Sequence, residues 1–325
     1  MANSGTIKSI NIKSVLNVLS EHESITKSDI AKYTGLSFPT VSTVIEHLID
    51  KNEVNEVGVE DSIGGRCAKK YSLNPMYAVS LLLYLEGNKL NWIVSDFCRN
   101  KIASGNLNCK DRILEEMNEI IYSIKSSYSQ LASIVIGVAS NVNNGKIMSH
   151  IEYKELQGIN ISEYFEEKYG IPVIIENDMN VAVRGYLDRH SSNDIEVVVN
   201  IYIGDNGMGA SMIINGKVCK GKSNFAGELH YLPICDDNIK YAKEGFGESD
   251  IVEYYGKVIQ SYVSLINPNL IVLYNNVYIK GKLEDIKNYC KVRIPEEAMA
   301  KIILSDEFKE DYEFGLSMMA SELIS

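Results

Sequence analysis

The sequence predicts an α/β protein in which a small helical head precedes a larger body of two lobes. The first observation is a pair of short helices joined by a glycine turn within Thr26–Val57. The second is that apolar strands and helices follow one another in two similar sets along the rest of the chain. A chain of 325 residues has room for two or three domains. We therefore expect a head over residues 1–75 and a body over residues 76–325.

The pair of helices in the head has recognisable ends. Gly35 suits the left-handed turn that ends the first helix, and Ser37 suits the N-cap of the second. The second helix repeats apolar residues at helical spacing, namely Val41, Val44, Ile45 and Leu48. An earlier helix near Ile10–Ser20 would complete a three-helix core. This is the pattern of a helix-turn-helix.

Side chains outside that apolar stripe are left to contact another molecule. At the start of the second helix they are small or apolar, which suits base edges and thymine methyl groups in a major groove, and the helix N-terminus suits a phosphate. After the helices, VNEVGVEDSIGGRCAKKYSL has the strand, loop, strand pattern of a wing, whose cations can reach phosphates or a minor groove. The expected DNA contacts are Ser37, Phe38, Thr40, Ser42, Thr43, Arg66, Lys69 and Lys70.

The charge of the chain is compatible with a nucleic-acid partner only at the head. The net charge is −11, yet residues 1–80 contain eight Lys or Arg and nine Asp or Glu, so the remaining residues carry −10. A nearly neutral head makes few phosphate contacts, so we expect a homodimer or tetramer that places two heads on double-stranded operator DNA. The alternative for the head is a small helical module that binds another protein.

Short apolar segments mark the strands of the body. Three of them between residues 79 and 107 indicate an antiparallel meander, and IVIGVAS, IPVIIEN, EVVVNIYIG and LIVLY are typical of buried strands. We expect lobe 1 over about 76–180 together with the C-terminal helix, and lobe 2 over about 181–310. Residues at the ends of strands would border a cleft between the lobes.

Three polar stretches lie where that cleft is expected. Asp178, at the end of Glu176-Asn177-Asp178, is either a general base or the N-cap of the next helix. The stretch Gly204–Gly209, GDNGMG, either cradles a phosphate or forms a plain hairpin turn. FAGELHYLPIC, Phe225–Cys235, places one Glu, one His and one Cys within eight residues, which raises the question of a metal or catalytic site.

Taken in order, TGLSFPTVSTVIEHL, GGR before LNP, ENDMN, GMGASMIING and FAGEL resemble motifs of the ROK family, over the full length of the chain. That family unites sugar kinases with sugar-responsive transcriptional repressors of the xylose and N-acetylglucosamine type. The resemblance implies a winged helix-turn-helix followed by a two-lobed actin-like domain of the sugar kinase, Hsp70 and actin type. It also implies that Asn177, Asp178 and Glu228 bind a sugar, with Asp178 in the position of the kinase's catalytic base.

The phosphate-binding motifs of the family kinases are altered in this sequence. YLEGNK stands where the family has DxGGTK, so Tyr84 replaces the metal-organising Asp and Glu86 replaces a glycine. A carboxylate at that place would repel nucleotide phosphates. Asn206 replaces the Thr of the second phosphate loop, and Tyr274-Asn275-Asn276 replaces the glycine-rich adenosine loop. We therefore expect Asp178 to be catalytically inactive and the protein not to be an enzyme.

The zinc motif of the family is reduced as well. Tyr231 occupies the position of its His, and His230 lies one residue early and is expected to point away from the sugar. Of the CxCGxxGC cluster only Cys235 is left. One cysteine cannot replace three in a tetrahedral site, so we expect no metal and no cofactor.

The remaining composition indicates a cytoplasmic protein. The six cysteines are scattered without a CxxC pair, which favours free thiols over disulfides. No apolar run approaches the ~18 residues of a membrane span, and MANSGTIKSI lacks the apolar core of a signal peptide. We expect no membrane partner.

The sequence therefore predicts a DNA-binding transcriptional regulator, acting as a repressor, whose body binds a sugar or sugar derivative as effector without phosphorylating it. Two alternatives stay open. One is a divergent ROK sugar kinase with an accessory head, and the other is a dimeric DNA-binding regulator that binds no small molecule.

Overall fold

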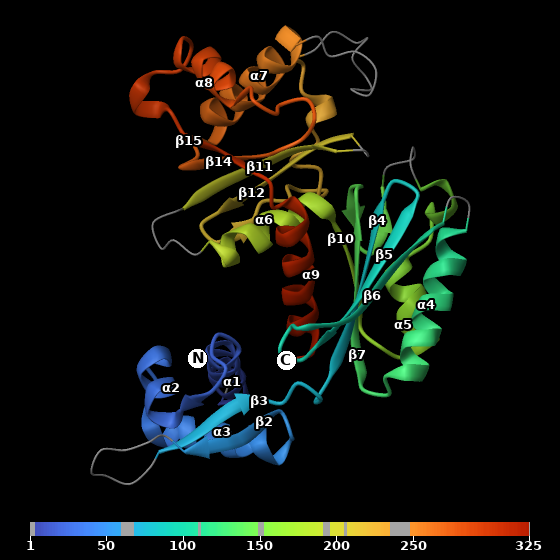
Figure 1. Ribbon diagram of the computed structural model, residues 1–325, viewed down its shortest axis with the longest axis vertical. Helices are drawn as coiled ribbons and strands as arrows, with labels where there is room; N and C mark the ends of the chain where they lie inside the picture. The colour runs from blue at the N-terminus through green and yellow to red at the C-terminus, as the bar shows by residue number, and fades with distance from the viewer. Residues whose placement is uncertain are drawn as a thin grey trace.

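The computed structural model of the chain describes residues 4–59, 68–109, 112–148, 153–190, 196–204, 207–234 and 248–324. Figure 1 shows a head formed by the N-terminal residues and two lobes, each built on a sheet of its own. A pair of helices lies between the two sheets. The predicted α/β class and the two-lobed body are confirmed.

The head is a small bundle of helices backed by an antiparallel sheet in the order β1-β3-β2. Its elements are α1 (Ser4–Ser20), β1 (Ile25–Thr26), α2 (Lys27–Thr34), α3 (Phe38–Asp50), β2 (Val54–Val59) and β3 (Lys69–Leu73). The helix α1 begins at Ser4 and not near Ile10, so it is longer than predicted.

The turn between α2 and α3 forms as the sequence predicts. Gly35 ends α2 with a φ of 68°, in the left-handed region that favours glycine. Ser37 caps α3, because its side chain accepts a hydrogen bond from a backbone N–H in the first turn. The predicted apolar stripe of α3 is buried: Val41, Val44, Ile45 and Leu48. These side chains pack with α1 in the core of the head.

The first lobe is a mixed sheet in the order β10-β7-β4-β5-β6. Its main elements are β4 (Val79–Glu86), β5 (Lys89–Asp96), β6 (Lys101–Asn108), α4 (Ile113–Ser127), β7 (Leu131–Val138), α5 (Ile161–Tyr169) and β10 (Val173–Asn177). The predicted antiparallel meander is β4-β5-β6, and β7 lies parallel to both β4 and β10. A short hairpin, β8 (Val142–Asn143) and β9 (Lys146–Ile147), follows β7.

The second lobe is a mixed sheet in the order β13-β12-β11-β14-β15. Its elements are β11 (Val197–Gly204), β12 (Gly207–Ile214), β13 (Lys217–Val218), the 3-10 turn Leu229–Tyr231, α7 (Glu248–Ile266), β14 (Leu270–Tyr274), α8 (Leu283–Lys291), the 3-10 turn Glu296–Ala298 and β15 (Lys301–Ser305). Strands β11 and β12 form an antiparallel hairpin, whereas β14 and β15 extend the sheet in parallel.

The helices between the sheets are α6 (Asp178–Arg189) and α9 (Phe308–Ile324), and they cross in close contact (Figure 1). A Cβ on Gly185 would lie 1.9 Å from the carbonyl oxygen of Asp311, and a Cβ on Gly315 would lie 2.3 Å from that of Val181. Glycine at both places therefore lets the two backbones touch. The apolar core around this crossing takes residues from β4, β7, β11, β12 and β14, so the two lobes share it.

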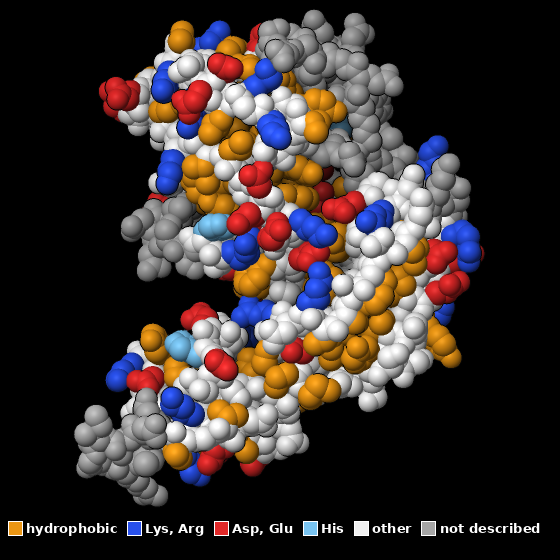
Figure 2. Space-filling view, viewed as in Figure 1, with side chains coloured by type: hydrophobic (Ala, Val, Ile, Leu, Met, Phe, Trp, Pro, Cys, Tyr) orange, Lys and Arg blue, Asp and Glu red, His pale blue; other side chains and the backbone are white. Residues whose placement is uncertain are grey.

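The head meets the body along a continuous apolar core and a neighbouring groove. Ala78, Phe97 and Ile324 belong to or pack against the core of the head. A groove of about 660 Å³ separates α1 from α6 and α9, and Figure 2 shows a deep hollow between the head and the body. None of the described helices is long and apolar enough to span a membrane.

Candidate functional site

A cavity of about 220 Å³ lies between the two lobes, where the ends of β7 and β10 meet β12 and the start of α9. The predicted sugar ligands Asn177, Asp178 and Glu228 all line it. The polar side chains of the lining, in full, are Glu86, Ser140, Asn177, Asp178, Tyr202, Asn180, Asn224, Glu228, His230 and Tyr312. Residues that lie far apart in the sequence thus share one site.

Asn177 and Asp178 are positioned by the junction between β10 and α6. Asn177 is the N-cap of α6, and its side-chain oxygen accepts a hydrogen bond from the Asn180 N–H at 3.0 Å. The interpretation of Asp178 as the N-cap is therefore wrong. The Asn177 amide donates to the Ser140 carbonyl oxygen at 3.2 Å and to the Asp178 carboxylate at 3.1 Å. These bonds fix the amide and the carboxylate side by side at the edge of the cavity.

Glu228 reaches the cavity from the opposite lobe on the AGE stretch. Gly227 has a φ of 98°, and a Cβ there would lie 1.9 Å from the Ala210 carbonyl oxygen, so glycine is needed for this loop to lie against β12. The Ala210 N–H donates to the Gly227 carbonyl oxygen at 2.9 Å. Burial raises the pKa of the Glu228 carboxyl above its ordinary value, because the charged form loses water.

His230 also lines the cavity, so the expectation that it points away from the site is wrong. Its Nε2 lies 3.5 Å from the position of a Cβ on Gly207, at the start of β12. Partial withdrawal from water lowers its pKa, which favours the neutral ring. Tyr231, which stands in the family's His position, is 71% exposed and packs its ring against Phe225 instead.

No group of three or more His, Cys, Asp or Glu in the described part of the chain could hold a metal ion. Cys235 lies outside the described residues, as do Asp205 and Asn206. The absence of a metal therefore stays a prediction. The glycine-rich stretch joins β11 and β12, which pair antiparallel up to Gly204 and Gly207, as the hairpin interpretation predicts.

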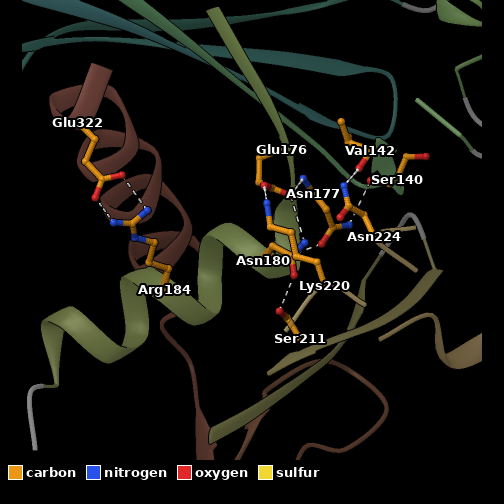
Figure 3. A network of polar contacts seen from close by, with 10 residues as sticks. All are labelled: Ser140, Val142, Glu176, Asn177, Asn180, Arg184, Ser211, Lys220, Asn224 and Glu322. Carbon is orange, nitrogen blue, oxygen red and sulfur yellow. Dashed lines mark hydrogen bonds and ion pairs between the residues drawn. The ribbon is translucent and has the colours of Figure 1, made fainter. Parts of the chain in front are cut away.

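A network of polar contacts ties the two lobes together beside the cavity (Figure 3). Lys220, which follows β13, forms an ion pair with Glu176 at the end of β10. Asn180 donates to Glu176 at 3.1 Å and accepts from Ser211 of β12 at 2.6 Å. Asn224 adds a further link, because its amide donates to the β8 carbonyl oxygen of residue 142 at 2.7 Å. No local pattern in the sequence indicates the contacts of Lys220, Ser211 and Asn224, since each of these joins residues from different parts of the body.

The residues that replace the kinase phosphate motifs make bonds within the protein. The Tyr84 hydroxyl donates to Glu313 at 2.7 Å, and its ring packs edge-on against Tyr312. The Tyr274 hydroxyl donates to Asp311 at 2.8 Å and accepts from Asn200 at 2.8 Å. Glu86, by contrast, lines the cavity, as do the stacked rings of Tyr202 and Phe308, whose centroids are 4.0 Å apart. Sequence reasoning did not identify these two aromatic residues.

The predicted DNA contacts fall on the start of α3 and on β3. Phe38 is 53% exposed, and Thr43 is exposed although its hydroxyl donates to the backbone of α3. Ser42 and Thr40 are partly buried, and the Thr40 hydroxyl lies 2.8 Å from that of Ser37. The structure therefore brings the residues of α3 together on the outside of the head. Their role stays a prediction.

The predicted basic contacts are less uniform. Lys69 is exposed and forms an ion pair of 2.8 Å with Glu56 of the neighbouring strand. Lys70 is partly exposed. Arg66 lies outside the described residues.

The chain is similar in sequence to proteins named xylose repressor. Xylose repressors from Bacillus subtilis (strain 168) and Bacillus spizizenii (strain ATCC 23059 / NRRL B-14472 / W23) are 24% identical over 236 residues and 23% identical over 288 residues. The matches cover 70% and 86% of this chain, and 61% and 74% of the two relatives. The chain thus spans about three fifths of the length of the first of them.

Solved structures show that the architecture is shared. A ROK family transcriptional regulator, a homolog of the E. coli MLC protein, has a TM-score of 0.70 at 17% identity and covers 97% of this chain and 99% of its own. A ROK family glucokinase from Streptomyces griseus, in complex with glucose and AMPPNP, has a TM-score of 0.59 at 14% identity and covers 75% of this chain and 100% of its own. The model of the ROK family matches residues 85–242, so this part of the chain is similar to ROK family proteins.

Proposed function

We propose that the protein is a DNA-binding transcriptional regulator, acting as a repressor, whose body binds a sugar or sugar derivative as effector without phosphorylating it. One observation carries the proposal. The chain joins a capped helix with an exposed start, α3, to a cavity that holds Asn177, Asp178 and Glu228. The relatives named xylose repressor support the same class of function.

Residues 1–75 would form the DNA-binding domain, a winged helix-turn-helix in which α3 enters the major groove. The caps at Thr26 and Ser37 and the tight turn at Gly35 support this assignment. The β2 and β3 strands would form the wing. Because Lys69 is paired with Glu56, it would have to exchange a carboxylate for a phosphate on binding. The nearly neutral head supports a homodimer or tetramer, in which two half-sites add their contacts.

Residues 76–325 would form the sensor domain, with the effector held between the lobes. A sugar offers several hydroxyl groups, and the two carboxylates and the amide of Asn177, Asp178 and Glu228 are suitable partners for them. These residues come from both lobes, so a ligand that contacts all three would change the preferred angle between the lobes. The ligand would thereby select one of two arrangements of the protein, to the extent that it binds one more tightly than the other.

A sugar kinase is the second candidate. It is favoured by the position of Asp178 in the cavity and by the fold shared with a ROK glucokinase. Glu86 in the lining argues against it, because a carboxylate repels nucleotide phosphates. The bonded tyrosines argue against it too, since Tyr84 stands in place of the metal-organising Asp and Tyr274 in place of the glycine-rich adenosine loop.

A gel-shift assay with DNA upstream of the gene and of its neighbours tests the DNA-binding proposal. We expect a specific complex at moderate salt that a sugar dissociates or strengthens. The absence of any specific complex across those fragments would refute the repressor. An ADP-release assay over pentoses, hexoses and amino sugars tests the kinase, and turnover that Asp178→Asn abolishes would establish it.

Thermal unfolding separates the sensor from a regulator that binds no small molecule. A ligand that binds only the folded protein must raise the melting temperature, by an amount set by its concentration relative to Kd. We expect at least one sugar of a broad panel to do so. A panel without any effect, combined with specific DNA binding, would leave the regulator without a ligand as the better assignment.

A further inference from the structure

We propose that Ser140 and Tyr312 are effector-binding residues, and that the effector is a polyhydroxyl sugar without a phosphate or carboxylate group. The proposal rests on the proposed function, because it names the chemistry of the molecule that the cavity takes. Neither residue is among the sugar ligands that the sequence predicts. Each of them is identified by the state of its hydroxyl group.

The hydroxyls of Ser140 and Tyr312 are buried and have no hydrogen-bond partner among the described residues. Ser140 is 8% exposed and Tyr312 is 1% exposed, and both line the cavity. A buried hydroxyl without a partner costs free energy, because it has lost the hydrogen bonds of water and gained none. A ligand oxygen that reaches these groups restores the missing bonds. A sugar hydroxyl both donates and accepts, so it can pair with either group.

Both hydroxyls lie beside the groups that already define the site. Ser140 follows β7, and the side-chain amide of Asn177 donates to its carbonyl oxygen at 3.2 Å. The Tyr312 hydroxyl lies over the last part of β7, where a Cβ on Gly137 would approach it to 2.0 Å. Glycine in β7 therefore leaves the room that the phenol occupies. Burial and the nearby Asp178 carboxylate raise the pKa of Tyr312, so its hydroxyl keeps its proton and can donate to the ligand.

The charges around the cavity restrict the ligand further. Glu86, Asp178 and Glu228 line it, and no Lys or Arg does so in the part of the chain that the structure describes. Lys220, which precedes the AGE stretch, is paired with Glu176 and lines the groove between the head and the body instead of the cavity. A phosphate or carboxylate on the ligand would therefore meet like charges without a counter-ion. Neutral sugars and amino sugars do not meet this repulsion.

Calorimetric titration of the full chain tests the class of ligand. The probes are D-xylose, D-glucose, N-acetylglucosamine and glucosamine, each beside an acidic counterpart such as glucose 6-phosphate or glucuronate. We expect at least one neutral or amino sugar to bind, and its acidic counterpart to bind at least ~10-fold more weakly. Tighter binding of a phosphate or an acid would overturn this inference while leaving the sensor function intact. Binding of no sugar at all would instead remove the sensor function on which the inference rests.

The variants Tyr312→Phe and Ser140→Ala test the two residues with the sugar found in that titration. We expect each to lower the affinity about 5- to 10-fold, and to leave the melting temperature of the ligand-free protein unchanged or raised. Tyr274→Phe is the matched control, because its hydroxyl is bonded to Asp311 and Asn200 and does not line the cavity. The control should lower the melting temperature and keep the affinity.

Two results would overturn the role of these residues. Unchanged affinity in both Tyr312→Phe and Ser140→Ala would show that the ligand does not use their hydroxyls. A melting temperature that falls in Tyr312→Phe as much as in Tyr274→Phe would show that the Tyr312 hydroxyl is bonded within the protein.

Discussion

Phe308 and Ile324 lie at opposite ends of one helix, α9, and contact different regions of the molecule. Phe308 lines the cavity, whereas Ile324 packs against the core of the head. Figure 1 shows the end of this helix next to the head. The helix has 17 residues, which at 1.5 Å per residue is roughly 25 Å. A single helix therefore joins the cavity to the core of the head, and we predict that it transmits a displacement at the cavity to the head.

Replacement of Ile324 by Ala should weaken this connection. We expect the ratio of operator affinities with and without effector to approach one, while the affinity for the effector itself stays the same. Because the side chain is only partly buried, the free energy of unfolding should fall by about 1–2 kcal/mol. Gel-shift titrations with and without effector measure the ratio. Leu265→Ala, at a 77% exposed position on α7, is the control, and an unchanged ratio in Ile324→Ala would contradict the connection through α9.

The close crossing of α6 and α9 predicts the sign of a change in the free energy of unfolding. Glycine in the interior of a helix is normally less favourable than alanine, so Gly185→Ala on an isolated helix would stabilise it by about 0.5–1 kcal/mol. Here the added Cβ would meet the carbonyl oxygen of Asp311 at 1.9 Å. We expect the free energy of unfolding to fall by about 1–3 kcal/mol, because the two helices must move apart. Denaturant unfolding measures it, and a stabilised variant would mean that the crossing is looser than described.

Much of the architecture follows from local patterns in the sequence. The glycine turn at Gly35, the cap at Ser37 and the meander of the first lobe are short-range features, and each was predicted where it occurs. The site residues Asn177, Asp178 and Glu228 were also predicted, because motifs of a family place them. Local sequence patterns and family motifs can both be recognised without knowing how the chain packs.

The rest of the site depends on packing that no local pattern reveals. Tyr312 lies more than a hundred residues from the strand β7 that it covers, and Lys220 meets Glu176 only because the lobes close on each other. His230 was placed outside the site by comparison with a metal motif, but the 3-10 turn directs it into the cavity. The N-cap of α6 is Asn177 and not Asp178. Local sequence does not distinguish the two, because Asn and Asp cap helices equally well.

The proposed DNA contacts of the head can be tested separately. Ser42→Ala should weaken specific binding by about 1–3 kcal/mol and leave non-specific binding almost unchanged, if its hydroxyl reaches a base edge. Ser42 is a sharper choice than Thr40, whose hydroxyl lies 2.8 Å from that of Ser37 and so supports the cap. Titrations against operator and unrelated DNA measure both affinities. Equal losses on both DNAs would contradict a role in base reading.

Lys70 tests the electrostatic part of DNA binding. Lys70→Gln should weaken specific and non-specific binding alike and reduce the slope of log K against log salt by about 1, because one phosphate contact is lost. Lys32→Gln is the control, since Lys32 is exposed on α2 but paired with Asp29 at 2.9 Å. A salt slope that changes with Lys32→Gln and not with Lys70→Gln would place the phosphate contacts on the other side of the head.

Glu228 gives a prediction for pH. Burial raises its pKa above the ordinary value of 4.5, so between the two values the folded protein binds more protons than the unfolded chain. The free energy of unfolding therefore falls as the pH rises through this window and stays lower above it. Glu228→Gln removes the titration, and we expect the variant to be more stable than the original protein at neutral pH. The advantage should vanish below pH 4.5, where the carboxyl is protonated in both states.

Denaturant unfolding at neutral and at acid pH measures this difference for the ligand-free protein. Glu284→Gln is the control of opposite sign, because the hydrogen bond from Lys287 lowers the pKa of that exposed carboxyl. Loss of the Glu284 carboxylate should slightly lower the free energy of unfolding at neutral pH and leave it unchanged in acid. If Glu228→Gln also proved less stable at neutral pH, the carboxylate would have a stabilising partner in the folded protein. Glu228 would then have a structural role, and the affinity for a sugar would not depend on its carboxylate.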